Sequence, residues 1–374
     1  MGGPLGPPMP FSHITSVDNH QLAELCKRLD ALASQLDAPG AWPAEQLRLC
    51  GQAGVFEWFL PLEHGGQGWS EADLLRAYLK LAAACLTTTF VITQRMGAVQ
   101  RIAAGQSEWA HRRLLPDLIA GRAFATVGIS HLTTSRQHLA APVLRAELTG
   151  DDVVLDGYSP WVTGAQHAQT LVLGATVDDG RQLLIAVPTS TPGVQIDHSP
   201  ELVGLSASRT GPVRLNRATI SAKWLLAGPV PEVMKLGVGA RTGGLQTSAL
   251  ALGLAGAAIT FAEQQAASRY NLTEPVEALR DEHDLLVAAM LALAGHADFP
   301  SDSPCALSGN DLRGRANSLA LRSTQAALAA AKGAGYVAGH PAGRWCKEAL
   351  FFLVWSCPAP VLQSNLCELA GIAH

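Results

Sequence analysis

The apolar positions of this chain change their spacing twice, which divides it into helices, short strands and helices again. From residue 14 to 38, leucines recur every three or four positions, as on one face of a helix, and Pro39-Gly40 ends the pattern. Ser70 is the expected N-cap of a later helix, with Asp73 three residues on. The other helices predicted in this first block cover residues 43–53, 74–84, 86–106 and 107–118.

A block of short strands begins at Phe124. Apolar and β-branched residues alternate loosely there, and the turn signals Gly150-Asp151-Asp152 and Asp156-Gly157 lie between the runs. The predicted strands cover residues 143–148, 153–158, 169–176, 182–187 and 212–220. This pattern indicates a sheet or barrel domain between the two helical blocks.

Helical spacing returns after residue 231. The segment 298–314 is rich in helix breakers and is expected to be a loop. The first predicted helical stretch covers residues 234–270, as one long helix or a broken pair. The other predicted helices cover residues 276–297, 315–332, 347–354 and 362–370. Antiparallel packing would bury their alanine and leucine faces against one another. The predicted segments are a Gly/Pro-rich leader (1–13), a helical domain (14–123), a sheet domain (124–230) and a helical bundle (231–374).

Composition limits the kinds of partner. Of 374 residues, 48% are apolar and only 16% are charged, which suggests that much surface is buried between the subunits of a homodimer or homotetramer. A net charge of −4 gives no basic face for nucleic acid. Residues 242–262 carry no charged side chain, but their small residues and missing aromatic belt indicate a buried helix rather than a membrane span.

The cysteines and the N-terminus bear on location. Seven cysteines form no C-x-x-C pair and are odd in number, which favours reduced thiols in a cytoplasmic protein. The first residues lack the basic-then-apolar pattern of a signal peptide. We identify no metal site.

Two hydroxyl-rich segments are the candidate chemistry. Ser130 to Ser135 and Trp161 to Thr163 are expected at strand ends, where short hydroxyls and free backbone N–H groups can dock a flat polar heterocycle. An indole such as Trp161 can cover one face of that ring.

These segments carry a family resemblance. The chain reads Ser130-His131-Leu132 and Ser135-Arg136-Gln137, followed by Gly157-Tyr158-Ser159-Pro160-Trp161-Val162-Thr163. It thus resembles the middle domain of the acyl-CoA dehydrogenase superfamily, which has a Thr-Glu-Pro…Gly-Ser-Asp loop and a later Gly-x-Lys-x-Trp-(Ile/Val)-Thr segment. The likeness extends loosely over most of the chain. It implies an α+β fold with an N-terminal helical domain, a middle antiparallel β domain and a C-terminal four-helix bundle.

The resemblance also implies FAD, bound between the sheet domain and the last helical domain. Ser130 stands for the family Thr that bonds the flavin, Ile129 precedes it, and Trp161 and Thr163 stand for the residues that flank and bond the ring. His131 replaces the family Glu; it could touch the cofactor or substrate, but a lone histidine in a loop is expected to be solvated.

Phosphate contacts are implied as well. Ser135 and Arg136 stand in the Gly-Ser-Asp loop, where a guanidinium could pair with a pyrophosphate or CoA phosphate. Arg269 matches the family Arg that reaches the FAD pyrophosphate of a neighbouring subunit. The Phe-Gly pair that follows it in the family is Leu272-Thr273 here, and Arg280 replaces a Gln.

The catalytic base of the family has no counterpart, so the catalytic residue is unknown. The family's Glu-Gly-Thr turn corresponds to Ser356-Cys357-Pro358, and the alternative position on the first bundle helix falls near Gly243. Glu348 is expected to be a structural ion-pair partner, and Cys357 an inert thiol.

Three functions remain open. The first is FAD-dependent α,β-dehydrogenation of an acyl thioester (acyl-CoA or acyl-carrier protein) with a substituted base, as in fatty acid metabolism, with an electron-transfer flavoprotein as partner. The second is a flavin monooxygenase of the same fold, supplied by a flavin reductase. The third is a non-catalytic subunit with this fold.

Overall fold

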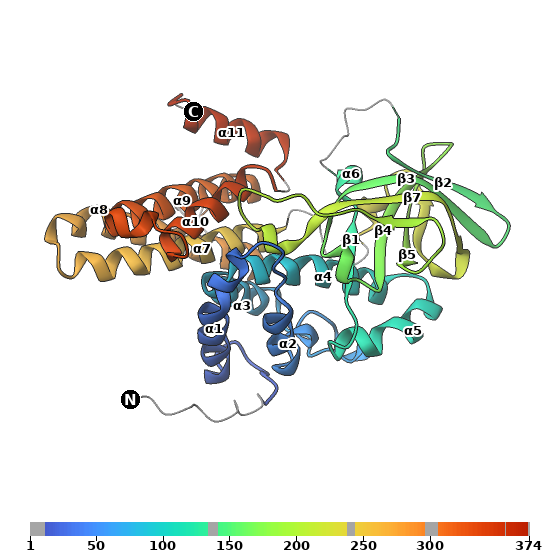
Figure 1. Cartoon of the computed structure of the whole chain (residues 1–374), viewed down its shortest axis with the longest axis horizontal. Coiled ribbons are helices and arrows are strands. Elements are labelled where there is room, and N and C mark those ends of the chain that lie inside the picture. Colours follow the sequence, from blue (N-terminus) through green and yellow to red (C-terminus); the bar gives the residue numbers. More distant parts are fainter. Residues whose placement is uncertain (1–11, 134–140, 238–243, 296–305, 356, 373–374) are drawn as a thin grey trace.

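The chain runs from an N-terminal helical block through a sheet to a C-terminal bundle, and the predicted fold class is confirmed (Figure 1). The computed structural model describes residues 12–133, 141–237, 244–295, 306–355 and 357–372. The sheet lies at one end of the molecule and the bundle at the other, with the N-terminal helices between and beside them.

The N-terminal helices follow the sequence signals closely. They are α1 (His20–Ala33), α2 (Ala44–Gln52), α3 (Glu71–Ala84), α4 (Leu86–Ala104) and α5 (Glu108–Ile119). Ser70 caps α3 as predicted, because its Oγ accepts a hydrogen bond from the Asp73 backbone N–H at 3.1 Å. The Ser70 hydroxyl also donates to the Asp73 carboxylate at 2.7 Å, which fixes the start of the helix.

The sheet has eight strands in the order β6-β7-β3-β2-β4-β5-β8, with β1 paired to β4. The strands are β1 (Ala125–Gly128), β2 (Leu144–Thr149), β3 (Asp152–Thr163), β4 (Thr170–Val177), β5 (Gln182–Pro188), β6 (Val194–Ile196), β7 (Thr210–Ser221) and β8 (Leu225–Val230). Most pairs are antiparallel, as expected, but β1–β4 and β2–β4 are parallel. Sequence alternation misses β1, β6 and β8, which are short, and ends β3 five residues early.

The C-terminal helices are α7 (Leu245–Ala266), α8 (Thr273–Gly295), α9 (Gly309–Ala331), α10 (Pro341–Ala349) and α11 (Ala359–Leu369). The predicted loop 298–314 is too long at its C-terminal end, because α9 already begins at Gly309. Ser308 caps it by accepting a hydrogen bond from the Asp311 N–H at 3.2 Å. The proposed helix over 234–270 is broken, with α7 as its central part.

Helix α7 is long and apolar enough to cross a membrane, by length and composition only. In its most apolar window, 67% of the residues are buried inside the protein. A Cβ at Gly253 would stand 2.6 Å from the Leu79 carbonyl oxygen, so α7 crosses α3 at backbone contact. This burial fits the predicted packed helix rather than a span.

The hydrophobic interior forms two main parts. One cluster runs continuously from α1 through α3 and α4 into α7, α8 and α9, so the two helical blocks share a core. A second cluster lies within the sheet, where the inward residues of β2, β3, β4, β5 and β7 meet. Residues of β1, β4, β5 and β8 also belong to the first cluster, so the sheet has an interior of its own and also packs against the joined helices.

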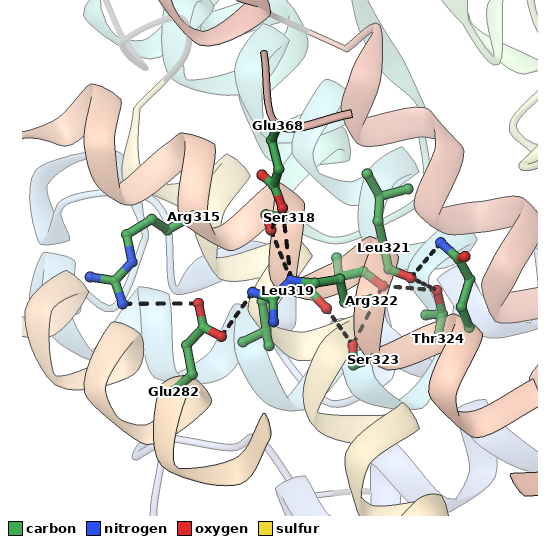
Figure 2. A network of polar contacts seen from close by, with 11 residues as sticks. Glu282, Arg315, Ser318, Leu319, Leu321, Arg322, Ser323, Thr324 and Glu368 are labelled. Atoms are coloured by element: carbon green, nitrogen blue, oxygen red, sulfur yellow. Dashed lines mark hydrogen bonds and ion pairs between the residues drawn. The ribbon is translucent and has the colours of Figure 1, made fainter. Parts of the chain in front are cut away.

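Polar contacts tie three helices of the bundle together (Figure 2). Arg322 of α9 donates to Glu282 of α8 at 2.8 Å, and Arg315 lies 3.9 Å from the same carboxylate. On its other side Arg322 bonds Ser318, whose hydroxyl donates to Glu368 of α11. These contacts fix α11 against α9 through a single carboxylate.

Candidate functional site

The first site segment lies where β1 ends. Ile129 is buried, and its carbonyl accepts a hydrogen bond from the Leu132 N–H at 2.9 Å, which starts a single helical turn, α6 (Ser130–Thr133). The Thr133 hydroxyl closes this turn on the Ser130 carbonyl at 3.2 Å. The described part of the hydroxyl-rich segment, Ser130–Thr133, therefore lies at a strand end, as the sequence predicted, and it forms a helical turn there.

Four buried polar atoms without a protein partner belong to this turn and to the strands β1 and β3. They are Thr126 Oγ1, Ser130 Oγ, His131 Nδ1 and Ser159 Oγ, half of the eight such atoms found in the part of the chain that the structure describes. A buried donor or acceptor without a hydrogen-bond partner lowers the stability of the fold by about 1–3 kcal/mol, so such groups are rare in folded proteins. Their concentration at one place indicates a site built for a ligand with its own donors and acceptors.

Close approach of two strands brings Ser130 and Ser159 into one neighbourhood. A Cβ at Gly128 would lie 2.7 Å from Ser159 Oγ and 2.7 Å from a methyl of Leu173, so β1 lies directly against β3 and β4 at this point. Only glycine allows this contact. The end of β1 and the motif strand β3 thus meet as the resemblance implied.

His131 is buried, with 8% of its surface exposed, so the expectation that it is solvated is wrong. Its Nε2 lies 2.8 Å from the Gly174 carbonyl oxygen. A carbonyl can only accept, so Nε2 carries the proton and Nδ1 keeps a lone pair. Burial lowers the pKa of His131, while the hydrogen bond to Gly174 opposes that shift. The imidazole is therefore neutral at neutral pH.

Trp161 faces outward from β3 with 48% of its surface exposed. It borders a hollow of about 460 Å³, a size in the usual range for small-molecule sites. The hollow is lined by Tyr158, Pro160, Trp161, Pro200, Pro212 and Arg214. Two aromatic rings and three prolines make flat apolar walls, and Arg214, paired with Asp197 at 2.7 Å, supplies the charge. The indole is open to a planar ligand.

Thr163 faces inward instead. It is buried, and its hydroxyl lies 2.8 Å from that of Thr210, which in turn lies 2.8 Å from the Ser208 hydroxyl. Each hydroxyl of this chain can donate once and accept as well. Thr163 therefore already has a protein partner, and a ligand bond would extend this row of hydroxyls.

Arg269 is not brought to the sheet of its own chain. It follows the last turn of α7, which runs from the sheet side to the far end of the bundle (Figure 1). Its guanidinium donates to Gln265 Oε1 at 2.7 Å and to the Ala330 carbonyl at 2.8 Å. Arg280 is likewise occupied, because it forms an ion pair with Glu263 at 2.8 Å. Ser135 and Arg136 lie outside the described residues.

The two acids near the C-terminus do not reach the site. Glu348 is 4% exposed and accepts from the Thr87 hydroxyl at 3.2 Å, which places it between α10 and α4. Glu348 thus forms a hydrogen bond with Thr87 in place of the expected ion pair. The nearby Arg344 is paired with Asp37, at 4.0 Å. Burial is the main cause that raises the pKa of Glu348 to about 7. Glu368 is engaged by α9, as described above.

The two positions expected for the family base, Gly243 and Ser356, lie outside the described residues, and neither side chain is a carboxylate. Burial raises the pKa of the neighbouring Cys357 thiol, an effect that Arg313 partly offsets. A raised pKa keeps the thiol protonated, which fits the expected inert cysteine.

Sequence reasoning missed Thr126, Ser159 and Arg214 as site residues. Ser159 lies within the Gly157–Thr163 motif, and its inward direction could be read from strand alternation once Pro160 is assigned to a bulge. Arg214 could not be found this way, because it faces Tyr158 only through the β3–β7 pairing.

Sequence comparison finds acyl-CoA dehydrogenases among the relatives of this chain. A model of the acyl-CoA dehydrogenase N-terminal domain matches residues 22–122. The chain is 25% identical over 261 residues to a probable acyl-CoA dehydrogenase of Bacillus subtilis, with 68% of each chain covered. It is 24% identical over 366 residues to the mitochondrial short-chain specific acyl-CoA dehydrogenase of Rattus norvegicus, with 91% of this chain and 87% of the relative covered.

Solved structures share the fold over nearly the whole chain. Glutaryl-CoA dehydrogenase in complex with glutaryl-CoA has a TM-score of 0.78 at 19% identity and covers 95% of this chain and 96% of its own. Dibenzothiophene monooxygenase from a Paenibacillus species has a TM-score of 0.73 at 16% identity and covers 94% and 96%. The chain therefore matches the acyl-CoA dehydrogenase N-terminal domain over residues 22–122, has acyl-CoA dehydrogenases among its sequence relatives, and shares their fold.

Proposed function

We propose that this chain is an FAD-dependent oxidoreductase that introduces an α,β double bond into an acyl thioester. The observation that carries the proposal is the group of buried polar atoms without partners near the end of β1, one of which belongs to Ser159 in β3, the strand that also carries the open indole of Trp161. A flavin ring is flat, with carbonyl and nitrogen atoms along its edge, so it matches both features. Its family relatives include acyl-CoA dehydrogenases.

The residues present fit the flavin ring. Ser130 and Ser159 offer hydroxyls that can donate or accept, and His131 offers an acceptor nitrogen. Trp161 can cover one face of the ring, which is worth about 0.5–1.5 kcal/mol beyond the buried area. FAD, when bound, supplies the hydride acceptor that no side chain can provide.

We propose that a second copy of the chain contributes to binding the phosphates of FAD. Arg269 is bonded to Gln265 and Ala330 of its own chain, and we assign it to the cofactor phosphates of a neighbouring subunit because of the family resemblance. We therefore propose that the enzyme is a homodimer or homotetramer. We also propose that it lies in the cytoplasm and passes its electrons to an electron-transfer flavoprotein.

Removal of the α-proton requires a group other than the usual carboxylate. Glu348 is closed off between two helices and Glu368 is bonded to Ser318, so neither is free to accept that proton. We assign the step to a substituted base and expect slow turnover, since a positioned base contributes about 10²–10⁴-fold to the rate.

An absorption spectrum of the purified protein tests the proposal. We expect flavin bands, or their appearance after FAD is added, followed by bleaching on addition of an acyl-CoA or acyl-carrier thioester without oxygen. Protein that stays colourless and takes up no FAD would refute the flavin assignment and favour a non-catalytic subunit.

A flavin monooxygenase is the second candidate. It is favoured by the absence of a carboxylate at both expected base positions, and dibenzothiophene monooxygenase shares the fold. A monooxygenase would consume reduced flavin supplied by a reductase only when oxygen is present. Thioester bleaching without oxygen supports the dehydrogenase, whereas oxygen-dependent turnover without such bleaching supports the monooxygenase.

A further inference from the structure

The Nδ1 atom of His131 is a buried acceptor that the protein itself does not use. The Gly174 carbonyl holds the proton on Nε2 at 2.8 Å, which leaves the Nδ1 lone pair as the only unfilled group on the ring. Nδ1 has no partner among the described residues. A ring fixed in this tautomer can accept a hydrogen bond from a ligand but cannot donate one.

The neighbouring Ser130 presents the complementary group. Its hydroxyl is also buried without a partner, so the serine and the histidine are not bonded to each other. The hydroxyl can donate to a ligand carbonyl while the imidazole accepts from a ligand N–H. The partner that the imidazole requires is thus a ligand N–H. The isoalloxazine ring of oxidised flavin carries one such donor, the N3–H group.

A role as the missing base fits His131 less well. A general base works best when its pKa lies near the working pH and when its proton can leave afterwards. Burial lowers the pKa of His131, and Nδ1 has no contact with solvent. A fixed acceptor needs neither property.

We propose that His131 binds the isoalloxazine ring by accepting a hydrogen bond from its N3–H at Nδ1. This inference rests on the proposed function, because it requires that the chain bind a flavin. The role depends on the imidazole tautomer of His131, which the Gly174 carbonyl of β4 fixes with the proton on Nε2.

Binding of FAD and of its N3-methyl analogue to the wild type and to His131→Phe tests the inference. The phenyl ring keeps the shape of imidazole and removes both nitrogens. We expect FAD affinity to fall about tenfold, as for one lost hydrogen bond, and affinity for the N3-methyl analogue to be the same in both proteins within about twofold. His283→Phe is the matched control, since His283 also contacts a helix carbonyl at 3.1 Å but lies in the bundle. It should bind both flavins like the wild type.

The outcomes separate the two claims. Wild-type protein that takes up no FAD refutes the proposed function and this inference together. Wild-type uptake with equal losses for FAD and the analogue in His131→Phe, or with no loss, refutes the inference alone. Should His131→Phe fail to fold, the nitrogen chemical shifts of His131 in the wild type decide. A proton on Nδ1 overturns the inference, and a proton on Nε2 that persists with a shifted Nδ1 signal after FAD is added supports it.

Discussion

The buried carboxyl of Glu348 gives a stability test that needs no ligand. Burial raises the pKa of Glu348 from 4.5 to about 7; Arg344 and the bond from Thr87 oppose the rise, and Asp37 adds to it. The folded protein thus holds this proton more tightly than the unfolded chain does. The resulting stabilisation is fully present when the pH lies below the pKa of Glu348 in the unfolded chain, and it is lost as pH rises from about 4.5 to about 7.

The size of the effect follows from the shift. A rise from 4.5 to about 7, at about 1.4 kcal/mol per pH unit, corresponds to about 3 kcal/mol. Glu348→Gln removes the titration but keeps an amide oxygen that can accept from Thr87. The free energy of unfolding of the variant, relative to that of the wild type, should therefore rise by about 3 kcal/mol between about pH 5 and pH 8.

Urea unfolding of both proteins across this range measures the difference. Glu108→Gln is the control, because this α5 carboxylate is exposed and has little burial to lose. The test compares plots of the unfolding free energy against pH for the wild type and Glu348→Gln. If their difference changes by less than about 0.5 kcal/mol from pH 5 to pH 8, the carboxyl is not buried as described and the reasoning fails.

Three further substitutions test other parts of the structure. Trp161→Ala should weaken FAD binding about tenfold by fluorescence titration, while Trp109→Ala on α5 leaves it unchanged; equal effects would remove Trp161 from the site. Gly253→Ala should lower the unfolding free energy by about 1–3 kcal/mol, because its Cβ meets a carbonyl at 2.6 Å, whereas Gly295→Ala meets nothing and should not; a stabilised Gly253→Ala contradicts the close crossing. Ser70→Ala should lower the melting temperature through loss of about 1 kcal/mol of capping energy, and an unchanged value argues against the cap.

Local signals explain why most helices could be predicted. Ser70 and its partner Asp73 lie three residues apart, so the cap is written in adjacent sequence and needs no tertiary contact. Ser308 carries the same signal, but it lies inside a segment rich in Gly, Pro and Asp. There the breaker content outweighed the cap, and the start of α9 was placed too late.

The site was harder to predict because its geometry comes from strand pairing. The predicted strand ended at residue 158, yet a register shift between Ser159 and Val162 lets β3 continue past Pro160 to Thr163. The burial of His131 depends on the carbonyl of Gly174, which is distant in sequence. The motif residues could therefore be named from the resemblance, but the unpaired polar atoms could be found only in three dimensions.

The shared core of the helical blocks affects how the protein can be cut into parts. A fragment that ends before residue 231 would lack α7, and the leucine and alanine side chains of α3 that pack against α7 would be exposed to water. We expect such a fragment to aggregate when expressed alone. A fragment restricted to the sheet would keep the interior between its own strands, but it would expose the apolar residues of β1, β4, β5 and β8 that pack on the helices.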